Sequence, residues 1–116
     1  MKAAAKKSTQ PFDNFCPKYL RAVELVGRRW TGAIIRVLLG GTKRYSEIAA
    51  AVPGISDRLL AERLRELDDE GIVKRIVACG PPVRVEYALT ESGAELEATI
   101  RALGAWADRW MTPRKK

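Results

Sequence analysis

The chain has 116 residues, 47% of them hydrophobic, and a formal net charge of +7, which suits one domain with a single core. No apolar run approaches the roughly 18 residues of a membrane span, the start MKAAAKKSTQP lacks the apolar stretch of a secretory signal, and two cysteines cannot form a disulfide scaffold, so we expect a cytoplasmic protein. Histidine is absent, which removes Ser-His and Cys-His nucleophiles and imidazole zinc sites, and we expect no enzyme activity, metal or cofactor.

The N-terminal part predicts an arm followed by two helices. Residues 1–12 have no apolar face and predict a flexible basic arm, and residues 114–116 form a short basic tail. A first helix is predicted from Cys16 to Gly27, with a proline in its first turn. A second helix is predicted at about residues 30–39, where two glycines end it.

Two further helices are separated by a very short turn. The first is predicted at residues 46–52 with Ser46 as its N-cap, and the second at residues 56–71 with Ser56 as its N-cap. Gly71 has the position of a C-terminal glycine. Because only residues 53–55 lie between them, the pair predicts a helix-turn-helix.

The C-terminal part predicts a hairpin and one long helix. Strands are expected at about 72–78 and 83–89, and the second shows the alternation of a half-buried strand, with Val83, Val85, Tyr87 and Leu89 on one face. Thr90 or Ser92 is expected to cap a single helix that reaches about Met111. The fold class is therefore mainly α with a small β-hairpin: a winged helix-turn-helix spanning residues 13–113, with extra N- and C-terminal helices.

The helix at 56–71 carries its charges in the order that its dipole disfavours, with arginines early and acids late. On a helical wheel its leucines face the core, and the opposite face would enter a DNA major groove. The side chains predicted to read bases are Arg58, Ala61, Glu62 and Arg65. Arginine can bond guanine and glutamate can accept from cytosine. The alternative is a solvated face held by ion pairs between successive turns.

Other basic residues lie where they would contact phosphates. Without the six bases of the two ends, 15 bases face 14 acids, yet stretches 28–44 and 74–84 contain no acid at all. The predicted phosphate and wing contacts are Lys43, Arg44, Ser46, Ser56, Arg63, Arg75 and Arg84. Arg63 is alternatively a packing stem, and Arg75 is alternatively paired with Glu86 across the hairpin.

Four segments together resemble the HxlR-type winged-helix bacterial regulators. They are CPKYLRAVELVGRRWT (16–31), RYSEI (44–48), GISDRLLAERLRELDDEGIVKR (54–75) and PPVRVEYALTESG (81–93). The resemblance implies a DNA-binding transcription factor, usually a homodimer built by its first and last helices, and a DNA-reading helix at 56–65. The chain departs from the family in having Gly-Arg-Arg-Trp at 27–30 and Cys79 in the wing.

The last helix supports a dimer independently of the resemblance. Its apolar residues step by four and three, a stripe that favours a partner helix, although part of it must cover the domain's own core. The residues expected at the dimer interface are Tyr19, Leu20, Val23, Ile100, Leu103, Ala107 and Trp110. A two-fold dimer predicts a palindromic operator on double-stranded DNA.

The signal to which the protein responds is left open by the sequence. Some regulators of the resembled family sense oxidants through a cysteine at the position of Cys16, and a helix start stabilises the reactive thiolate. Alternatively Cys16 is a small buried hydrophobic residue. A small apolar ligand between the dimer helices would be another signal, and nothing in the sequence identifies the effector.

Two classes of function remain after these exclusions. The first is a sequence-specific DNA-binding transcriptional regulator, and the second is a winged-helix protein–protein interaction module without specific DNA binding. Such a module has no need of acid-free basic stretches on both sides of its helix-turn-helix, and this chain has both. An enzyme ranks third, because no set of residues supports one.

Overall fold

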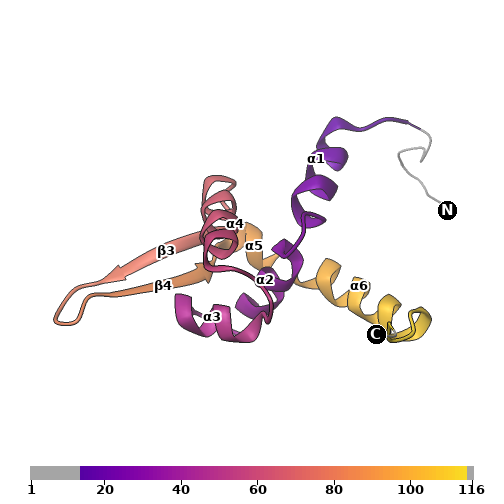
Figure 1. Ribbon diagram of the computed structural model, residues 1–116. Coiled ribbons are helices and arrows are strands. Elements are labelled where there is room, and N and C mark those ends of the chain that lie inside the picture. The colour runs from indigo at the N-terminus through magenta and orange to yellow at the C-terminus, as the bar shows by residue number, and fades with distance from the viewer. Residues whose placement is uncertain (1–13, 115–116) are drawn as a thin grey trace.

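Six helices and three short strands make up residues 14–114, the part of the chain that the computed structural model describes (Figure 1). They are α1 (Pro17–Val26), α2 (Thr31–Leu38), β2 (Lys43–Arg44), α3 (Tyr45–Ala51), α4 (Asp57–Asp69), β3 (Val73–Ala78), β4 (Arg84–Leu89), α5 (Glu91–Ala94) and α6 (Glu97–Trp110). The predicted mainly helical winged helix-turn-helix is confirmed. The proposed arm at residues 1–12 and the tail residues Lys115 and Lys116 lie outside the described residues.

The hydrophobic core lies where α2, the helix-turn-helix and the start of β3 meet. In α4 the apolar residues recur every three or four positions, so they form one stripe on its inner side. The buried hydrophobic residues are Ile34, Ile35, Leu38, Ile48, Val52, Leu60, Leu64, Leu67 and Val73. The predicted inner face of the DNA-reading helix is thus confirmed.

The hairpin belongs to a three-stranded antiparallel sheet of order β2-β4-β3. The sequence predicted only the hairpin, because a strand of two residues leaves no periodic pattern. Lys43 lies opposite Tyr87 and Arg44 lies opposite Glu86. This pairing fixes the entry of α3 beside the wing, so two basic segments far apart in the sequence become neighbours.

The register of the hairpin rules out the predicted cross-strand pair of Arg75 and Glu86. Arg75 lies opposite Tyr87, and Glu86 lies opposite Ile76. Residues directly opposite each other share a face of the sheet, and successive residues alternate between faces. Arg75 and Glu86 therefore occupy opposite faces, and that alternative was wrong.

The second strand also starts later than predicted. Val83 precedes β4 and its side chain is exposed, so its assignment to a half-buried face was wrong. Tyr87 and Leu89 do pack against the core. The wing extends away from the domain (Figure 1), and an alternating pattern cannot indicate where a core ends beneath a hairpin.

The single C-terminal helix of the sequence prediction is in fact two helices. Thr90 caps α5, because its Oγ1 accepts from the Gly93 N–H at 3.3 Å. The Leu96 N–H then bonds to the Gly93 carbonyl at 3.1 Å, a tighter turn than an α-helix makes. A Cβ on Gly93 would lie 2.2 Å from the Ile72 carbonyl oxygen. The close packing of α5 on the chain entering β3 requires this glycine, and the tighter turn at Leu96 separates α5 from α6.

The N-cap of α3 is Arg44, not Ser46 as the sequence predicted. Glu47 Oε1 accepts the Arg44 N–H at 2.8 Å, so the acid in the first turn supplies the cap bond. Ser46 lies one residue inside the helix and is exposed. A serine just before an apolar run did not distinguish the cap from the first turn.

The first and last helices project from the domain on the side away from the wing (Figure 1). Neither helix contains a buried residue. Leu96 and Ile100 pack partly against the core, while the rest of α6 extends outward. No helix within residues 14–114 is long and apolar enough to span a membrane.

Candidate nucleic-acid interface

The turn between α3 and α4 is fixed by close packing and by one hydrogen bond. Gly54 has φ = +94°, a left-handed conformation that glycine adopts without strain. A Cβ atom added to Gly54 would lie 3.4 Å from the Trp30 ring. Tyr45 Oη donates to the Asp57 carbonyl at 2.7 Å, which joins the first residues of the two helices. Burial, helped by the nearby Asp57 and Tyr87, raises the pKa of the Tyr45 phenol above its ordinary value.

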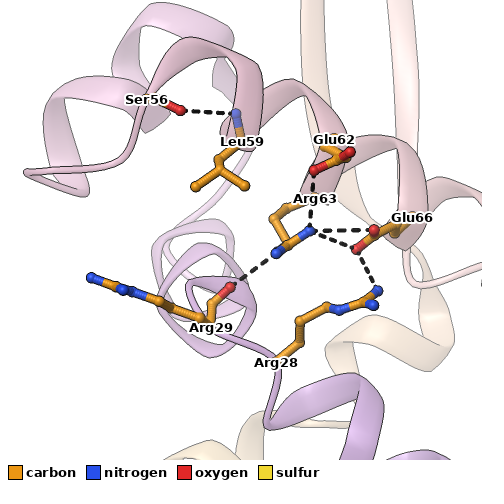
Figure 2. A network of polar contacts seen from close by, with 7 residues as sticks. All are labelled: Arg28, Arg29, Ser56, Leu59, Glu62, Arg63 and Glu66. Carbon is orange, nitrogen blue, oxygen red and sulfur yellow. Dashed lines mark hydrogen bonds and ion pairs between the residues drawn. The ribbon is translucent and has the colours of Figure 1, made fainter.

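Ser56 caps the N-terminus of α4, as the sequence predicted. Its Oγ accepts the Leu59 N–H at 3.1 Å (Figure 2). This bond satisfies one of the free amides at the helix start. The hydroxyl is therefore engaged in the cap, and its predicted contact with phosphate stays a prediction.

The outer face of α4 displays three of the four predicted base-reading residues to solvent. Arg58, Ala61 and Arg65 are exposed. Their spacing of three and four residues places them on one side of the helix. Within residues 14–114, neither arginine takes part in an ion pair. The alternative of a face held together by its own ion pairs therefore has no support at these two arginines.

Glu62, the fourth predicted base-reading residue, is half-buried at the edge of that face. Its Oε1 lies 3.6 Å from Arg63 NH1, a loose ion pair. The carboxylate is thus partly directed toward the protein.

Arg63 differs from the other arginines of α4. Its side chain is only 13% exposed, and its guanidinium lies against Glu66 and against the main chain at Arg29 (Figure 2). Of the two sequence interpretations, this geometry favours the packing stem over the phosphate contact. The neighbouring Glu66 and Arg28, which complete this contact, were not singled out by the sequence, and only a long-range contact could have revealed them.

The predicted phosphate contacts lie on two adjoining elements. Lys43 and Arg44 form β2 at the entry of α3, and Arg84 starts β4 of the wing. Arg44, Arg75 and Arg84 are exposed, while Lys43 is half-buried. Because β2 pairs with β4, Arg44 and Arg84 share the face of the sheet that carries Glu86, whereas Lys43 and Arg75 share the opposite face with Tyr87.

The helices α1 and α6 expose large apolar side chains. Tyr19 is 70% exposed and Trp110 is 64% exposed. The other exposed members of the two faces are Leu20, Val23, Leu103, Trp106 and Met111. Large apolar side chains exposed along two helices are typical of interaction surfaces. Of the residues predicted for a dimer interface, Ile100 instead packs partly against the domain's own core, and Ala107 is half-buried.

Both cysteines are free thiols at very different places in the fold. Cys16 is the N-cap of α1, where its sulfur accepts the Tyr19 N–H at 3.4 Å, and it is half-exposed. Cys79 is exposed in the loop of the wing. The half-exposed position disagrees with the alternative of Cys16 as a buried hydrophobic residue.

A helix-turn-helix packed beside a three-stranded wing, with an exposed basic face on its second helix, defines the winged-helix DNA-binding regulators. The sequence profile of the HxlR-like helix-turn-helix family matches residues 25–115. The chain belongs to the HxlR-like helix-turn-helix family, whose members are transcriptional regulators.

Relatives and solved structures agree with this assignment. The chain is 46% identical over 101 residues to the HTH-type transcriptional regulator YodB of Bacillus subtilis, covering 87% of this chain and 90% of YodB. It is 45% identical over 98 residues to the uncharacterized HTH-type transcriptional regulator YvaP of the same organism, covering 84% and 91%. The reduced form of YodB superposes with a TM-score of 0.77 over 88% of this chain and 100% of that structure. The oxidized redox regulator HypR, 34% identical, superposes with a TM-score of 0.76 over 87% and 100%. The protein is therefore a DNA-binding transcriptional regulator.

Proposed function

We propose that the protein is a sequence-specific regulator that binds a palindromic operator as a homodimer. The observation that carries this proposal is the exposed outer face of α4, where Arg58 and Arg65 have no ion-pair partner among the described residues. Arginine fits the two acceptors of guanine in the major groove, and Ala61 leaves room for a base edge between them. Glu62 would accept from cytosine after a small rotation away from Arg63.

Phosphate contacts would flank this face on both sides. Arg44 at the entry of α3 and Arg84 on the wing are the strongest candidates, because both are exposed and β2 lies beside β4. Lys43, Ser46, Ser56 and Arg75 are weaker candidates from the helix-turn-helix and the wing. Contacts of this kind are independent of sequence and lose affinity as salt rises. Arg63 is not included, because its guanidinium is already bonded within the protein.

The apolar faces of α1 and α6 would form the dimer interface. Tyr19, Leu20 and Val23 would contribute from α1, and Leu103, Ala107 and Trp110 from α6. All of these residues except the half-buried Ala107 are exposed in the single chain, which supports this proposal, since most such surfaces are covered by a partner. Two recognition helices related by a two-fold axis would contact half-sites about 34–36 Å apart, one turn of DNA.

Cys16 is the proposed sensor of an oxidant or electrophile. It is half-exposed at the first turn of α1, the helix that carries half of the proposed dimer interface. The relative YodB has been solved in diamide-treated and quinone-bound forms, and HypR in oxidized and reduced forms. Modification of Cys16 would then alter the packing of α1 and with it the distance between the two recognition helices.

The remaining assignments follow from DNA as the partner. The DNA-binding and dimerisation unit would be residues 13–113, with basic segments at 1–12 and 114–116. The protein would act in the cytoplasm, where bacterial DNA lies, and would have no catalytic activity.

Selection of bound fragments from sheared genomic DNA, at near-physiological salt, tests the proposal. The expected result is a palindrome with half-sites one turn apart, whose binding falls on Arg58→Ala substitution. Diamide should weaken binding of the wild type and leave Cys16→Ser unaffected. Recovery of unrelated, salt-labile fragments would instead favour a protein-interaction module, and an equal response of Cys16→Ser would remove the sensor role.

A further inference from the structure

Arg63 links the recognition helix to the turn between the first two helices. Its Nε donates to the carbonyl oxygen of Arg29 at 3.1 Å, and its NH1 lies 3.3 Å from both carboxylate oxygens of Glu66. Arg28 NH1 approaches the same carboxylate at 3.1 Å. Figure 2 shows the resulting chain of contacts, which runs from the 28–29 main chain through Arg63 and Glu66 back to Arg28.

The turn that receives Arg63 has an unusual backbone. Trp30, directly after the Arg29 carbonyl, has φ = +79°, a region that bulky residues rarely adopt. The Arg29 guanidinium lies over the Trp30 ring at 4.9 Å, and the same ring packs near Gly54 in the helix-turn-helix. Arg63 thus bonds to a turn whose conformation is already set by several contacts. The turn can therefore hold α4 in a fixed position.

The leucines of α4 cannot fix its orientation by themselves. Burial of Leu60, Leu64 and Leu67 is strongly favourable but has little directionality. A guanidinium bonded on two sides is directional, since its planar donors require defined acceptors. A tilt of about 10° in a helix about 20 Å long moves its end by roughly 2–3 Å, and a hydrogen bond to a base edge does not tolerate such a shift.

We propose that Arg63 is the positioning residue of the recognition helix. Together with Glu66 it holds α4 at the angle from which Arg58 and Arg65 reach the bases, and it touches no DNA itself. The inference rests on the proposed base-reading role of the outer face of α4. It adds a residue that determines specificity through the other two.

Two roles are open to Arg63, a phosphate contact and the positioning of α4. They predict opposite effects of a substitution at Glu66 on the affinity for the operator. If Arg63 contacted a phosphate, neutralising Glu66 would free the guanidinium and remove a negative charge near the DNA, so binding would tighten. If Arg63 positions α4, neutralising Glu66 weakens the link and lowers specific binding, although the protein becomes more positive. Glu66→Gln keeps the shape of the side chain and therefore separates the two interpretations.

The experiment compares wild type, Arg63→Met, Arg63→Lys and Glu66→Gln, with Arg65→Met as the matched control two residues away. Each protein is checked for a folded circular-dichroism spectrum at the assay temperature, and affinities for the selected operator and for a random duplex are measured over a range of salt. Loss of stability alone leaves the affinity of the folded molecules unchanged.

For Arg63→Met we expect about tenfold weaker binding to the operator, with unchanged random-duplex affinity and salt slope. Arg63→Lys should not restore binding, because an ammonium cannot bond in two directions from one plane. Glu66→Gln should weaken operator binding in the same direction. On single-base operator variants, Arg65→Met should relax the preference at the one base that Arg65 reads, whereas Arg63→Met should lower affinity at the positions read by both Arg58 and Arg65.

Three results would overturn the inference: an equal loss on both DNAs with a salt slope smaller by about one for Arg63→Met, tighter binding by Glu66→Gln, or unchanged operator binding by Arg63→Met. Failure of the proposed function has a different signature, because wild type itself would then not distinguish the operator from the random duplex.

Discussion

The outer face of α4 and the flank that α4 turns toward α1 use the same residue types in opposite ways. On the outer face Arg58 and Arg65 are exposed, without ion pairs to other described residues. On the flank Arg63 is nearly buried, and Glu66 accepts from Arg63 and forms an ion pair with Arg28. At the helix end Glu70 pairs with Arg21 at 3.4 Å. One helix therefore carries a cationic face for a partner and an ion-paired flank for its own domain.

This difference explains why the helix tolerates charges in an order that its dipole disfavours. A DNA-facing helix needs early arginines, and the sequence alone suggested only that reason. The structure adds that Glu66 and Glu70, near the C-terminus, have arginine partners from α1 and the following turn. Those cations offset the repulsion between late acids and the helix dipole. Glu70 thereby contacts α1, and Glu66 contacts the turn that follows it.

The largest expected effect is on stability. It concerns the buried leucines of α4, which support its outer face and its ion-paired flank alike. Leu60 and Leu67 are both fully buried at opposite ends of the inner stripe. Replacing either by alanine should lower the free energy of unfolding by about 2–5 kcal/mol, through lost burial and a residual cavity. Urea unfolding measures this loss. A near-silent substitution at either end would show that only half of α4 belongs to the core.

The next largest effect is on operator binding, and it is expected from the outer face of α4 and not from its ion-paired flank. Arg58→Ala should weaken operator binding by about 1–3 kcal/mol and relax the base preference at one position, with little change in stability. Asp69→Asn, on an exposed residue at the other end of the helix, serves as the control and should leave the base preference intact. Competition binding with single-base operator variants provides the measurement. A uniform loss across all the variants would make Arg58 a phosphate contact.

A smaller effect on stability is expected at two serines, which lie at the N-termini of the two helices of the helix-turn-helix. Ser56→Ala removes the cap bond to Leu59 and should cost about 1 kcal/mol of unfolding free energy. Ser46→Ala, at an exposed position inside α3, should change stability by only a few tenths of a kcal/mol, since alanine is the better helix former. Thermal unfolding of both variants distinguishes them. Equal losses would return Ser46 to the N-cap role.

The sequence predicts those parts of the fold that depend on local pattern. The leucine spacing of α4, the cap at Ser56 and the short turn around Gly54 follow from periodicity and from residue chemistry, and each is confirmed. The exposure of Arg58 and Arg65 follows from the same helical wheel. Their contact with bases is a matter of the bound complex and stays a prediction.

Long-range contacts account for what the sequence could not predict. A two-residue strand such as β2 exists only because β4 lies beside it, and the register that separates Arg75 from Glu86 is set by pairing along the whole hairpin. The glycine at position 93 is required by the close approach of α5 to Ile72, a contact that no local pattern reveals. The sequence set Arg63 apart as a phosphate contact or a packing stem, and only the folded position of the 28–29 turn shows which acceptors its guanidinium meets.

The smallest expected effect tests how firmly α1 is attached to the ion-paired flank. Arg21 and Glu70 are both largely exposed, with side chains 74% and 43% accessible. Solvent screens such a pair and its long side chains lose entropy when ordered, so Arg21→Ala should cost less than about 0.5 kcal/mol of unfolding free energy. The difference from wild type should disappear in about 1 M salt, where the Debye length falls to roughly 3 Å.

Parallel urea titrations at low and high salt measure the loss in unfolding free energy. The control is Arg101→Ala, which removes the exposed ion pair with Glu97 within α6. A loss well above that of the control would mean that this single contact fixes α1 to the recognition helix. A loss equal to the control would leave the link to Arg63 and Glu66 as the connection between them.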